Sequence, residues 1–426
     1  MSPERELEML VAMTQALVRV DSQTPPSATG DVAHVARDFM ADMPGLLLRP
    51  YVSEHPVENL VAVLDGGLPG PRTILSGHLD TYPIGDAGAW AFDPLGGCIK
   101  DGYLYGRGSA DMKGGVAVLI AAVLRWAKRR PFHGSLVLAL AGDEERMGEL
   151  GTQWLIDNAE EIRGDGVLVA DVGGASTIRL GEKGMLWLDI AAEGRQAHGA
   201  HTYAGTNAAD RLLDALVSLR AVESLAPEPP MDACRIMAAA ARLSGDSVEL
   251  RRTMNAVTVN VGLMRAGTSP NLVPATAAAA IDIRIPVGLT TNAVEAALAA
   301  ELDHREGISW KITRRYEPSW TFSNSAFAQA CLKGANAAGR GDIRFDNRIG
   351  GSDARLWRRA GLPCAVVGLS PINLGAPDEA CRTGELFDLL EIYDHMLMSL
   401  HGRECDGDPA DASGSLQRRG ETRSGE

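Results

Sequence analysis

Residues 73–80 read TILSGHLD, a short apolar run that ends in a histidine and an aspartate. A glycine-dense turn, YGRGSADMKGG, follows at residues 105–115, and apolar residues continue from it as a helix to about residue 128. The next apolar run is at residues 135–141. This order of strand, helix and strand predicts a sheet that is covered by helices.

The same alternation continues on both sides of this segment. Apolar residues recur at helical spacing over residues 5–20, and the runs at residues 60–64 and 167–170 indicate further strands. From residue 318 onward the helix and strand pattern returns. We therefore predict an α/β domain with a mixed sheet whose chain is interrupted by an insertion.

The insertion has a different order of elements: strand, helix, two strands, helix and strand. They are expected at residues 185–192, 207–222, 256–264, 276–285, 292–305 and 308–316. This order is typical of a ferredoxin-like α+β domain. The predicted domain limits are residues 1–183 and 318–403 for the first domain and 184–317 for the insertion. Residues 404–426 are polar and are predicted to form a disordered tail.

Composition limits the possible partners. The 426 residues include 41 basic and 55 acidic side chains, a formal net charge of −14. The absence of a clustered Lys/Arg stripe argues against nucleic acid and membrane surfaces. No apolar run is long enough to span a bilayer, and the acidic N-terminal pattern is unlike a secretion leader, so we expect a cytoplasmic protein. The six cysteines contain no Cys-x-x-Cys pair, so we expect buried thiols.

Several strand ends carry side chains that suit a divalent metal. His78 and Asp80 share one face of an extended segment, so Asp80 can orient the imidazole of His78. Asp111 lies in the glycine-dense turn, where its carboxylate favours a cation over a phosphate. Asp171 ends the strand at residues 167–170, at the edge of the sheet where ligand sites lie in open α/β folds.

Glu144 and Glu145 follow the strand at residues 135–141. Adjacent glutamates point in different directions, so one can bind a metal while the other acts as a general base on a metal-activated water. Each of these motifs alone occurs more often by chance or as a solvated turn. Their convergence on one edge of the sheet is what indicates a metal-dependent active site.

In this order the motifs resemble those of the aminoacylase, glutamate carboxypeptidase and acetylornithine deacetylase family, metallopeptidase family twenty. The resemblance spans about residues 5–400. It rests on residues 76–80, 106–108, 111–115, 143–145, 198–199, 205–208, 282–284 and 350–353. It implies that Asp111 bridges two metals and precedes a cis peptide bond. The other implied ligands are His78 and Asp171 for one metal and Glu145 for the second.

The resemblance also implies roles for other residues. Glu144 would be the general base, with Asp80 orienting His78. In the inserted domain, His198 matches a family histidine that enters a partner subunit's active site and stabilises an oxyanion, which makes a homodimer the catalytic unit. Arg284 matches the family arginine that binds a substrate carboxylate, and Asn271 is a further candidate substrate contact. The insertion is therefore expected to be a lid and dimerisation domain.

One position departs from the family pattern. The second metal usually takes a histidine two residues before the proline of an H-x-P-x-E segment, and Gly375 stands there. Nearby Asn373, Asp378 and Glu379 are candidates to replace that histidine. Zinc, manganese and cobalt all suit the remaining imidazole and carboxylate ligands, so we expect one or two such ions per chain.

Three functions follow from these residues. The first is hydrolysis of a C–N bond in a small carboxylate-bearing substrate, of the amidase, deacylase or aminoacylase type. The second, suggested by Gly375, is single-metal hydrolytic deamination of an aminoaromatic acid such as 5-nitroanthranilate, as in the family's nitroanthranilate aminohydrolase branch. The third is a family member that binds a ligand without turnover, against which the intact set of candidate catalytic residues argues.

Overall fold

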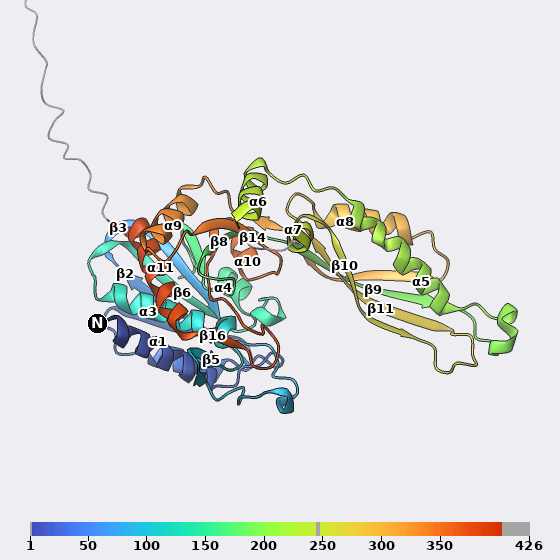
Figure 1. Cartoon of the computed structure of the whole chain (residues 1–426), viewed down its shortest axis with the longest axis horizontal. Helices are drawn as coiled ribbons and strands as arrows, with labels where there is room; N and C mark the ends of the chain where they lie inside the picture. The colour runs from blue at the N-terminus through green and yellow to red at the C-terminus, as the bar shows by residue number, and fades with distance from the viewer. Residues whose placement is uncertain (1, 244–247, 403–426) are drawn as a thin grey trace, which may run out of the picture.

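The computed structural model describes residues 2–243 and 248–402, which form a large sheet and a smaller sheet, each covered by helices (Figure 1). The large sheet has the strand order β1-β2-β6-β3-β7-β15-β8-β13, and β14 pairs with β8. These strands are β1 (Leu46–Glu54), β2 (Val57–Asp65), β3 (Gly67–His78), β6 (Phe132–Ala141), β7 (Gly166–Val169), β8 (Thr177–Glu182), β13 (Ser319–Trp320), β14 (Arg344–Arg348) and β15 (Cys364–Val366).

Parallel and antiparallel pairs occur together in this sheet. β3 is parallel to β6 and β7, and β7 is parallel to β15, whereas β1, β2 and β6 pair antiparallel. The predicted mixed sheet is therefore confirmed. The parallel strands form the centre of the sheet, so their carboxyl ends meet at one edge.

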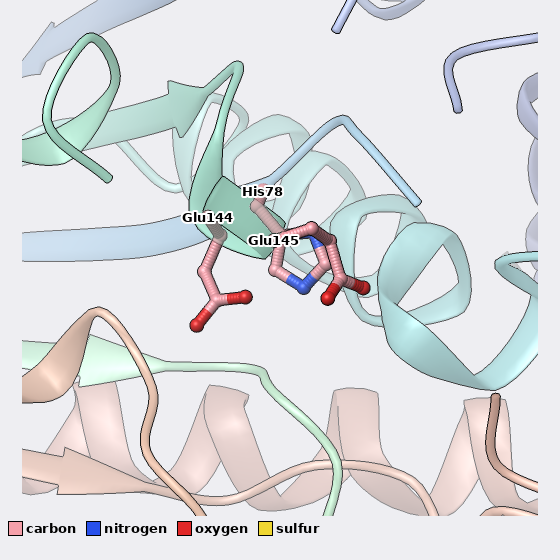
Figure 2. Close-up of side chains that lie close together, drawn as sticks. All are labelled: His78, Glu144 and Glu145. Atoms are coloured by element: carbon pink, nitrogen blue, oxygen red, sulfur yellow. The ribbon is translucent and has the colours of Figure 1, made fainter. Parts of the chain in front are cut away.

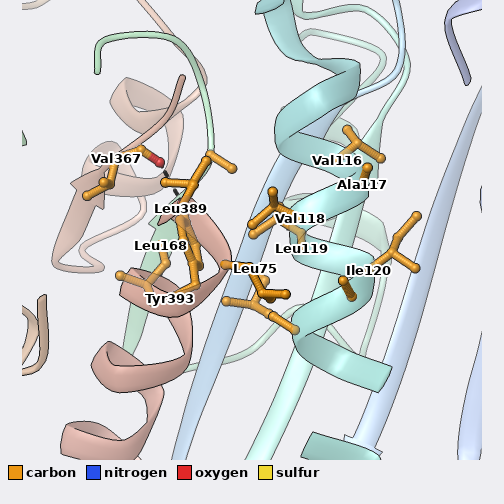
Figure 3. Packing of buried hydrophobic residues seen from close by; sticks show 14 of the residues in the cluster. Leu75, Val116, Ala117, Val118, Leu119, Ile120, Leu168, Val367, Leu389 and Tyr393 are labelled. Carbon is orange, nitrogen blue, oxygen red and sulfur yellow. Dashed lines mark hydrogen bonds between the residues drawn. The ribbon is translucent and has the colours of Figure 1, made fainter. Parts of the chain in front are cut away.

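Helices cover both faces of the large sheet. One face packs against α1 (Pro3–Val18), α3 (Gly114–Ala127), α9 (Ala326–Ala337) and α11 (Thr383–His401), and the other against α4 (Thr152–Asn158) and α10 (Ala354–Arg359). Strand alternation explains the division, because Leu75 of β3 points into the first core and Ile74 into the second. Figure 3 shows α3 and α11 side by side over Leu75 and Leu168, with the Tyr393 hydroxyl donating to the carbonyl of Val367.

The smaller sheet has the strand order β10-β11-β9-β12 and is antiparallel. Its strands are β9 (Gly184–Glu193), β10 (Thr258–Ala266), β11 (Thr276–Ile285) and β12 (Ile308–Tyr316). Apolar side chains from alternate positions pack against α5 (Ala208–Leu219) and α8 (Thr291–Leu302). This confirms the predicted order of elements in the insertion, and in Figure 1 the smaller sheet extends away from the large one.

The limits predicted at residues 183 and 317 fall between strands of the two sheets. The division into domains and the lid role of the smaller sheet stay predictions, and the predicted tail lies outside the described residues. The sequence patterns did not predict α2 (Gly30–Asp38), α6 (Met231–Leu243) or α7 (Val248–Asn255). Throughout residues 2–243 and 248–402, no helix combines the length and apolar character needed to cross a membrane.

A third sheet of three short strands connects the glycine-dense turn to the C-terminal segment. It consists of β4 (Cys98–Lys100), β5 (Tyr103–Tyr105) and β16 (Ala380–Arg382), in the order β16-β5-β4. The five cysteines in the described residues are free thiols, of which Cys331, Cys364 and Cys381 are buried. Buried thiols were expected, whereas Cys98 and Cys234 are exposed.

Candidate metal centre and active site

Three adjacent parallel strands deliver the candidate ligands to one edge of the large sheet. His78 is the last residue of β3, the two glutamates follow β6 in the short helical turn Glu144–Arg146, and Asp171 follows β7. Asp111 lies in the turn before α3, and the peptide bond between Asp111 and Met112 is cis, as the resemblance implied. The sheet topology thus explains how residues distant in sequence meet.

His78, Asp111 and Asp171 form the first group of potential ligands. Their ligand atoms lie within 4.8 Å of one another, and all three side chains are buried. His78 Nε2 lies 3.0 Å from Asp111 Oδ1. Repulsion between buried carboxylates is relieved by Arg348, whose Nη1 lies 2.7 Å from Asp171 Oδ2.

His78, Glu144 and Glu145 form the second group, again within 4.8 Å. Figure 2 shows the two glutamates leaving the turn in different directions beside His78, as the sequence argument expected. Glu145 Oε1 is buried and has no hydrogen-bond partner among the described side chains. A buried carboxylate oxygen without a donor suits a metal ligand, and the mixture of imidazole and carboxylates is a donor set that zinc, manganese and cobalt accept.

Asp80 connects the two groups of potential ligands. His78 Nδ1 donates to the backbone carbonyl of Asp80 at 2.9 Å, and the Asp80 carboxylate lies 3.5 Å away. That carboxylate accepts hydrogen bonds from the backbone N–H of Glu144 and of Glu145, at 3.0 and 3.1 Å, and from the hydroxyl of Thr24 at 2.8 Å. Asp80 therefore contacts His78 mainly through its main chain and uses its carboxylate to hold the glutamate turn.

Burial raises the pKa of Glu144 and of Glu145 well above the usual range, because removal from water disfavours the charged carboxylates. For Glu145 the negative charges of Asp111 and Glu144 add to this effect. For Glu144 the positive charges of His78 and Arg355 oppose it, and Arg355 Nη1 lies 3.9 Å from Glu144 Oε1. A carboxyl group with a raised pKa is a suitable proton carrier near neutral pH.

Glu379, a candidate to replace the missing family histidine as a metal ligand, has other partners in the structure. Its Oε2 accepts from Arg107 Nη1 at 2.5 Å, and its Oε1 accepts from the backbone N–H groups of Gly108, Ala110 and Asp111 at 3.1–3.2 Å. Glu379 is fully buried. This carboxylate therefore holds the turn that carries Asp111, and local sequence patterns could not reveal its partner.

The other two candidates also have other partners. Asp378 Oδ1 accepts from the backbone N–H groups of residues 91 and 92, and Asn373 Nδ2 donates to the Asp378 carbonyl. Neither side chain belongs to the two groups of potential ligands found in the described residues. Gly375 has a φ of +70°, and a Cβ added there would meet the ring of Tyr82 at 3.6 Å.

A cavity of about 330 Å³ opens onto the metal centre. Its lining includes Arg284, as expected for a substrate contact, and three cations that the sequence analysis missed, Lys183, Arg348 and Arg355. Arg348 and Arg355 flank the motif at residues 350–353, and this proximity in the sequence could have indicated them. Among its other lining residues are Met147, Met185, Leu374 and the aromatic residues Tyr82, Trp187 and Tyr316.

His198 and Asn271 lie elsewhere in this chain. Both are exposed, and they are close to each other, because Gly199 N donates to the Asn271 carbonyl at 2.7 Å. Neither lines the cavity next to Glu144. The structure therefore brings His78, Asp111, Asp171 and Glu145 together with Glu144 and Arg284, but not these two residues.

The profile of Peptidase family M20/M25/M40 matches residues 74–399. This chain belongs to the M20 peptidase family. A succinyl-diaminopimelate desuccinylase of Methylobacterium nodulans is 32% identical to this chain over 402 residues, which cover 91% of this chain and 95% of the relative. A second, from Rhodospirillum centenum, is 29% identical over 396 residues, 90% and 95% of the two chains.

Solved structures agree with this M20 fold. An M20 metallo-carboxypeptidase from Sulfolobus solfataricus superposes with a TM-score of 0.76 at 16% identity, over 93% of this chain and 98% of the other. Human carnosine dipeptidase 1 gives a TM-score of 0.70 at 16% identity, over 93% and 98%. The family match and the desuccinylase relatives identify this chain as a metal-dependent hydrolase that acts on C–N bonds.

Proposed function

We propose that this M20 enzyme hydrolyses the amide bond of a small N-acyl amino acid that carries more than one carboxylate. The observation that carries the proposal is the cavity itself, which joins Glu144 and Glu145 to four cationic side chains. Cations that line a partly closed cavity favour anionic substrates. The similar desuccinylases are named for a succinyl-diaminopimelate substrate, which has this chemistry.

The metal would be held by His78, Asp111, Asp171 and Glu145; the first three form one group of potential ligands, and Glu145 belongs with His78 and Glu144 to the other. When bound, it supplies a Lewis acid that polarises the amide carbonyl and acidifies water. The unpartnered Oε1 of Glu145 supports a second metal position, which Asp111 and Glu145 would share. We propose zinc, manganese or cobalt as the ion.

Glu144 carries the proton during the reaction. It accepts a proton from the attacking water and then donates it to the leaving nitrogen, so that an amide and water give a carboxylic acid and an amine. Arg355, at 3.9 Å, stabilises the ionised form of Glu144, and the backbone bond to Asp80 holds its turn in place. Arg284 binds a substrate carboxylate with the part of its guanidinium that does not contact Asp282.

A second copy of the chain completes this site in our proposal, with His198 acting on the partner's substrate. Two features support it: His198 is exposed away from its own cavity, and the edge strand β10 exposes Leu263 and Met264 beside a groove of about 580 Å³. A mixture of His198→Ala and Glu144→Gln proteins tests it, because a mixed dimer would contain one complete site. Recovery of activity on mixing supports the homodimer, and no recovery after verified subunit exchange would contradict it.

Deamination of an aminoaromatic acid is a second candidate. The aromatic side chains of Tyr82, Trp187 and Tyr316 in the cavity wall favour it, because they suit a planar ring. The products distinguish the two reactions: an amine and a carboxylic acid from an amide, or free ammonia from an arylamine. N-succinyl-L,L-diaminopimelate, N-acetyl amino acids, dipeptides and 5-nitroanthranilate form the substrate panel.

The role of Glu144 is tested by Glu144→Gln. We expect turnover of the best panel substrate to fall by about 10²–10⁴-fold, the usual contribution of a general base, with metal content unchanged. The control is Glu149→Gln, a change at an exposed residue of the same loop, which should retain full activity. Substantial activity in Glu144→Gln would remove this residue from the role of base.

A further inference from the structure

Tyr82 lies in the cavity wall, four residues after the end of β3. Apart from the neighbours of Gly375 in the chain, its ring is the group that a Cβ of Gly375 would meet among the described residues, at 3.6 Å from Cδ2. The same cavity is lined by Asp111, Glu144 and Glu145. A phenol therefore occupies the wall where the glycine leaves space, next to the carboxylates of the reaction centre.

The cationic donors Lys183, Arg355 and Arg348 in the cavity wall already have partners, whereas the buried Nε1 donor of Trp187 has none among the described residues. Lys183 Nζ donates to two backbone carbonyls at 2.7 Å, and Arg355 donates to two others at 2.5 and 2.8 Å. Arg348 Nη1 contacts Asp171. By contrast, the hydroxyl of Tyr82 makes no hydrogen bond with any residue in the described part of the chain. It is available to donate to a bound substrate.

The Tyr82 hydroxyl remains protonated in this environment. The negative charge of Glu145 is the largest cause that raises the pKa of Tyr82, followed by burial and then by Asp111 and Glu144. The pKa shifts upward from a value that is already near 10 in water, so the group is a neutral donor over the working range of most enzymes.

We propose that Tyr82 is a further catalytic residue, whose hydroxyl donates a hydrogen bond to the scissile carbonyl oxygen as negative charge develops on it. The inference rests on the proposed amide hydrolysis. The reacting carbonyl must lie within reach of Glu144, and the carboxylates of Glu144 and Glu145 are within 4.8 Å of each other. Tyr82 lines the cavity at this carboxylate pair. A donor that reaches the developing oxyanion stabilises the transition state more than the substrate.

Tyr82→Phe tests this role because it removes the hydroxyl and keeps the ring beside Gly375. We expect kcat for the best panel amide to fall by about 10²-fold, with KM and metal content unchanged. A phosphinic analogue of that amide, which mimics the tetrahedral oxyanion, should lose affinity by a similar factor. Binding of succinate, which lacks the tetrahedral centre, should not change.

Tyr51→Phe is the matched control. Tyr51 lies on β1 at the edge of the large sheet, and its hydroxyl donates to Glu161 at 2.6 Å. Because Tyr51 does not line the cavity, loss of this hydroxyl should leave kcat unchanged. A kcat of Tyr82→Phe within threefold of the wild-type value would overturn the inference and leave the proposed function standing. Loss of metal from Tyr82→Phe would overturn it too. A wild-type chain that hydrolyses no amide of the panel would overturn the proposed function and this inference together.

Discussion

Replacing Glu379 by glutamine should destabilise the turn that carries Asp111. Glu379 is fully buried, and Arg107, its ion-pair partner, is 1% exposed. The substitution keeps the length of the side chain and removes its charge. The Arg107 guanidinium would then stay in the interior without a counter-charge, beside the backbone carbonyls of Pro83 and Gly375 and the ring of Trp90. A buried charge without a counter-charge is costly because water cannot solvate it.

Two contributions set the size of the effect. Removing one partner of a buried ion pair typically costs about 3–5 kcal/mol. The two carbonyls that remain on Arg107 favour the lower end. The NH₂ group of the glutamine side chain must also face either Arg107 or the three backbone N–H groups now bound to Oε1. In both orientations a hydrogen-bond donor would face other donors. We therefore expect Glu379→Gln to lower the free energy of unfolding by about 3 kcal/mol.

Urea unfolding followed by tryptophan fluorescence measures this loss. With an unchanged slope m of about 3 kcal/mol per molar, the midpoint should fall by about 1 M. Asp189→Asn is the matched control: Asp189 pairs with Lys311 at 3.8 Å, their side chains are 50% and 73% exposed, and the change should cost less than about 1 kcal/mol. Adding Arg107→Met to Glu379→Gln should recover part of the loss, because no buried charge remains.

A decrease below about 1 kcal/mol in Glu379→Gln would refute the reasoning, since it would mean that the Arg107 charge is solvated or neutralised in another way. An additive double variant would refute it as well, because two residues of one buried pair must couple. Metal content provides an independent readout. If Glu379 positions Asp111, the variant should bind metal more weakly than the wild type.

Two further predictions concern His401 and Gly375. Burial lowers the pKa of His401 in the folded protein. The neutral ring donates from Nδ1 to the carbonyl of His133 and accepts at Nε2 from the Thr73 hydroxyl. As the pH falls, the unfolded chain therefore takes up a proton at this residue before the folded protein does. Its stabilising contribution is thus present above about pH 6.5 and lost below it, and urea midpoints at pH 7.5 and 5.5 should differ less in His401→Gln than in the wild type. Gly375→Ala should cost about 1–2 kcal/mol because φ is +70°, and Gly375→His should bind more metal per chain than Gly375→Ala; equal metal contents would show that an imidazole there does not reach the site.

The sequence predicted the parts of the fold that local apolar patterns encode. The runs at residues 73–76, 135–141 and 167–170 became β3, β6 and β7, and their parallel pairing gathers the candidate ligands. α7 was not predicted because few of its residues are apolar. Contacts with the rest of the protein stabilise this helix more than its own sequence pattern does.

Within the site, the residues that sequence motifs carry were found, but their partners were not. Arg107 and Glu379 are 272 positions apart, and only the folded chain shows that they form an ion pair. Arg348 and Arg355 flank the glycine-containing motif at residues 350–353, and only the folded chain shows that both line the cavity. Tyr82 belongs to no motif, and only the folded chain places its ring beside Gly375.

The position of β15 within the large sheet also determines when the enzyme can be completed during synthesis. The smaller sheet uses a continuous segment of chain that ends with β12 at Tyr316. The large sheet needs β15, made much later, to fill the gap between β7 and β8. Glu379, which holds the Asp111 turn, emerges later still. A growing chain therefore has its smaller sheet ready first, and a product that ends before residue 379 lacks the carboxylate that holds the Asp111 turn.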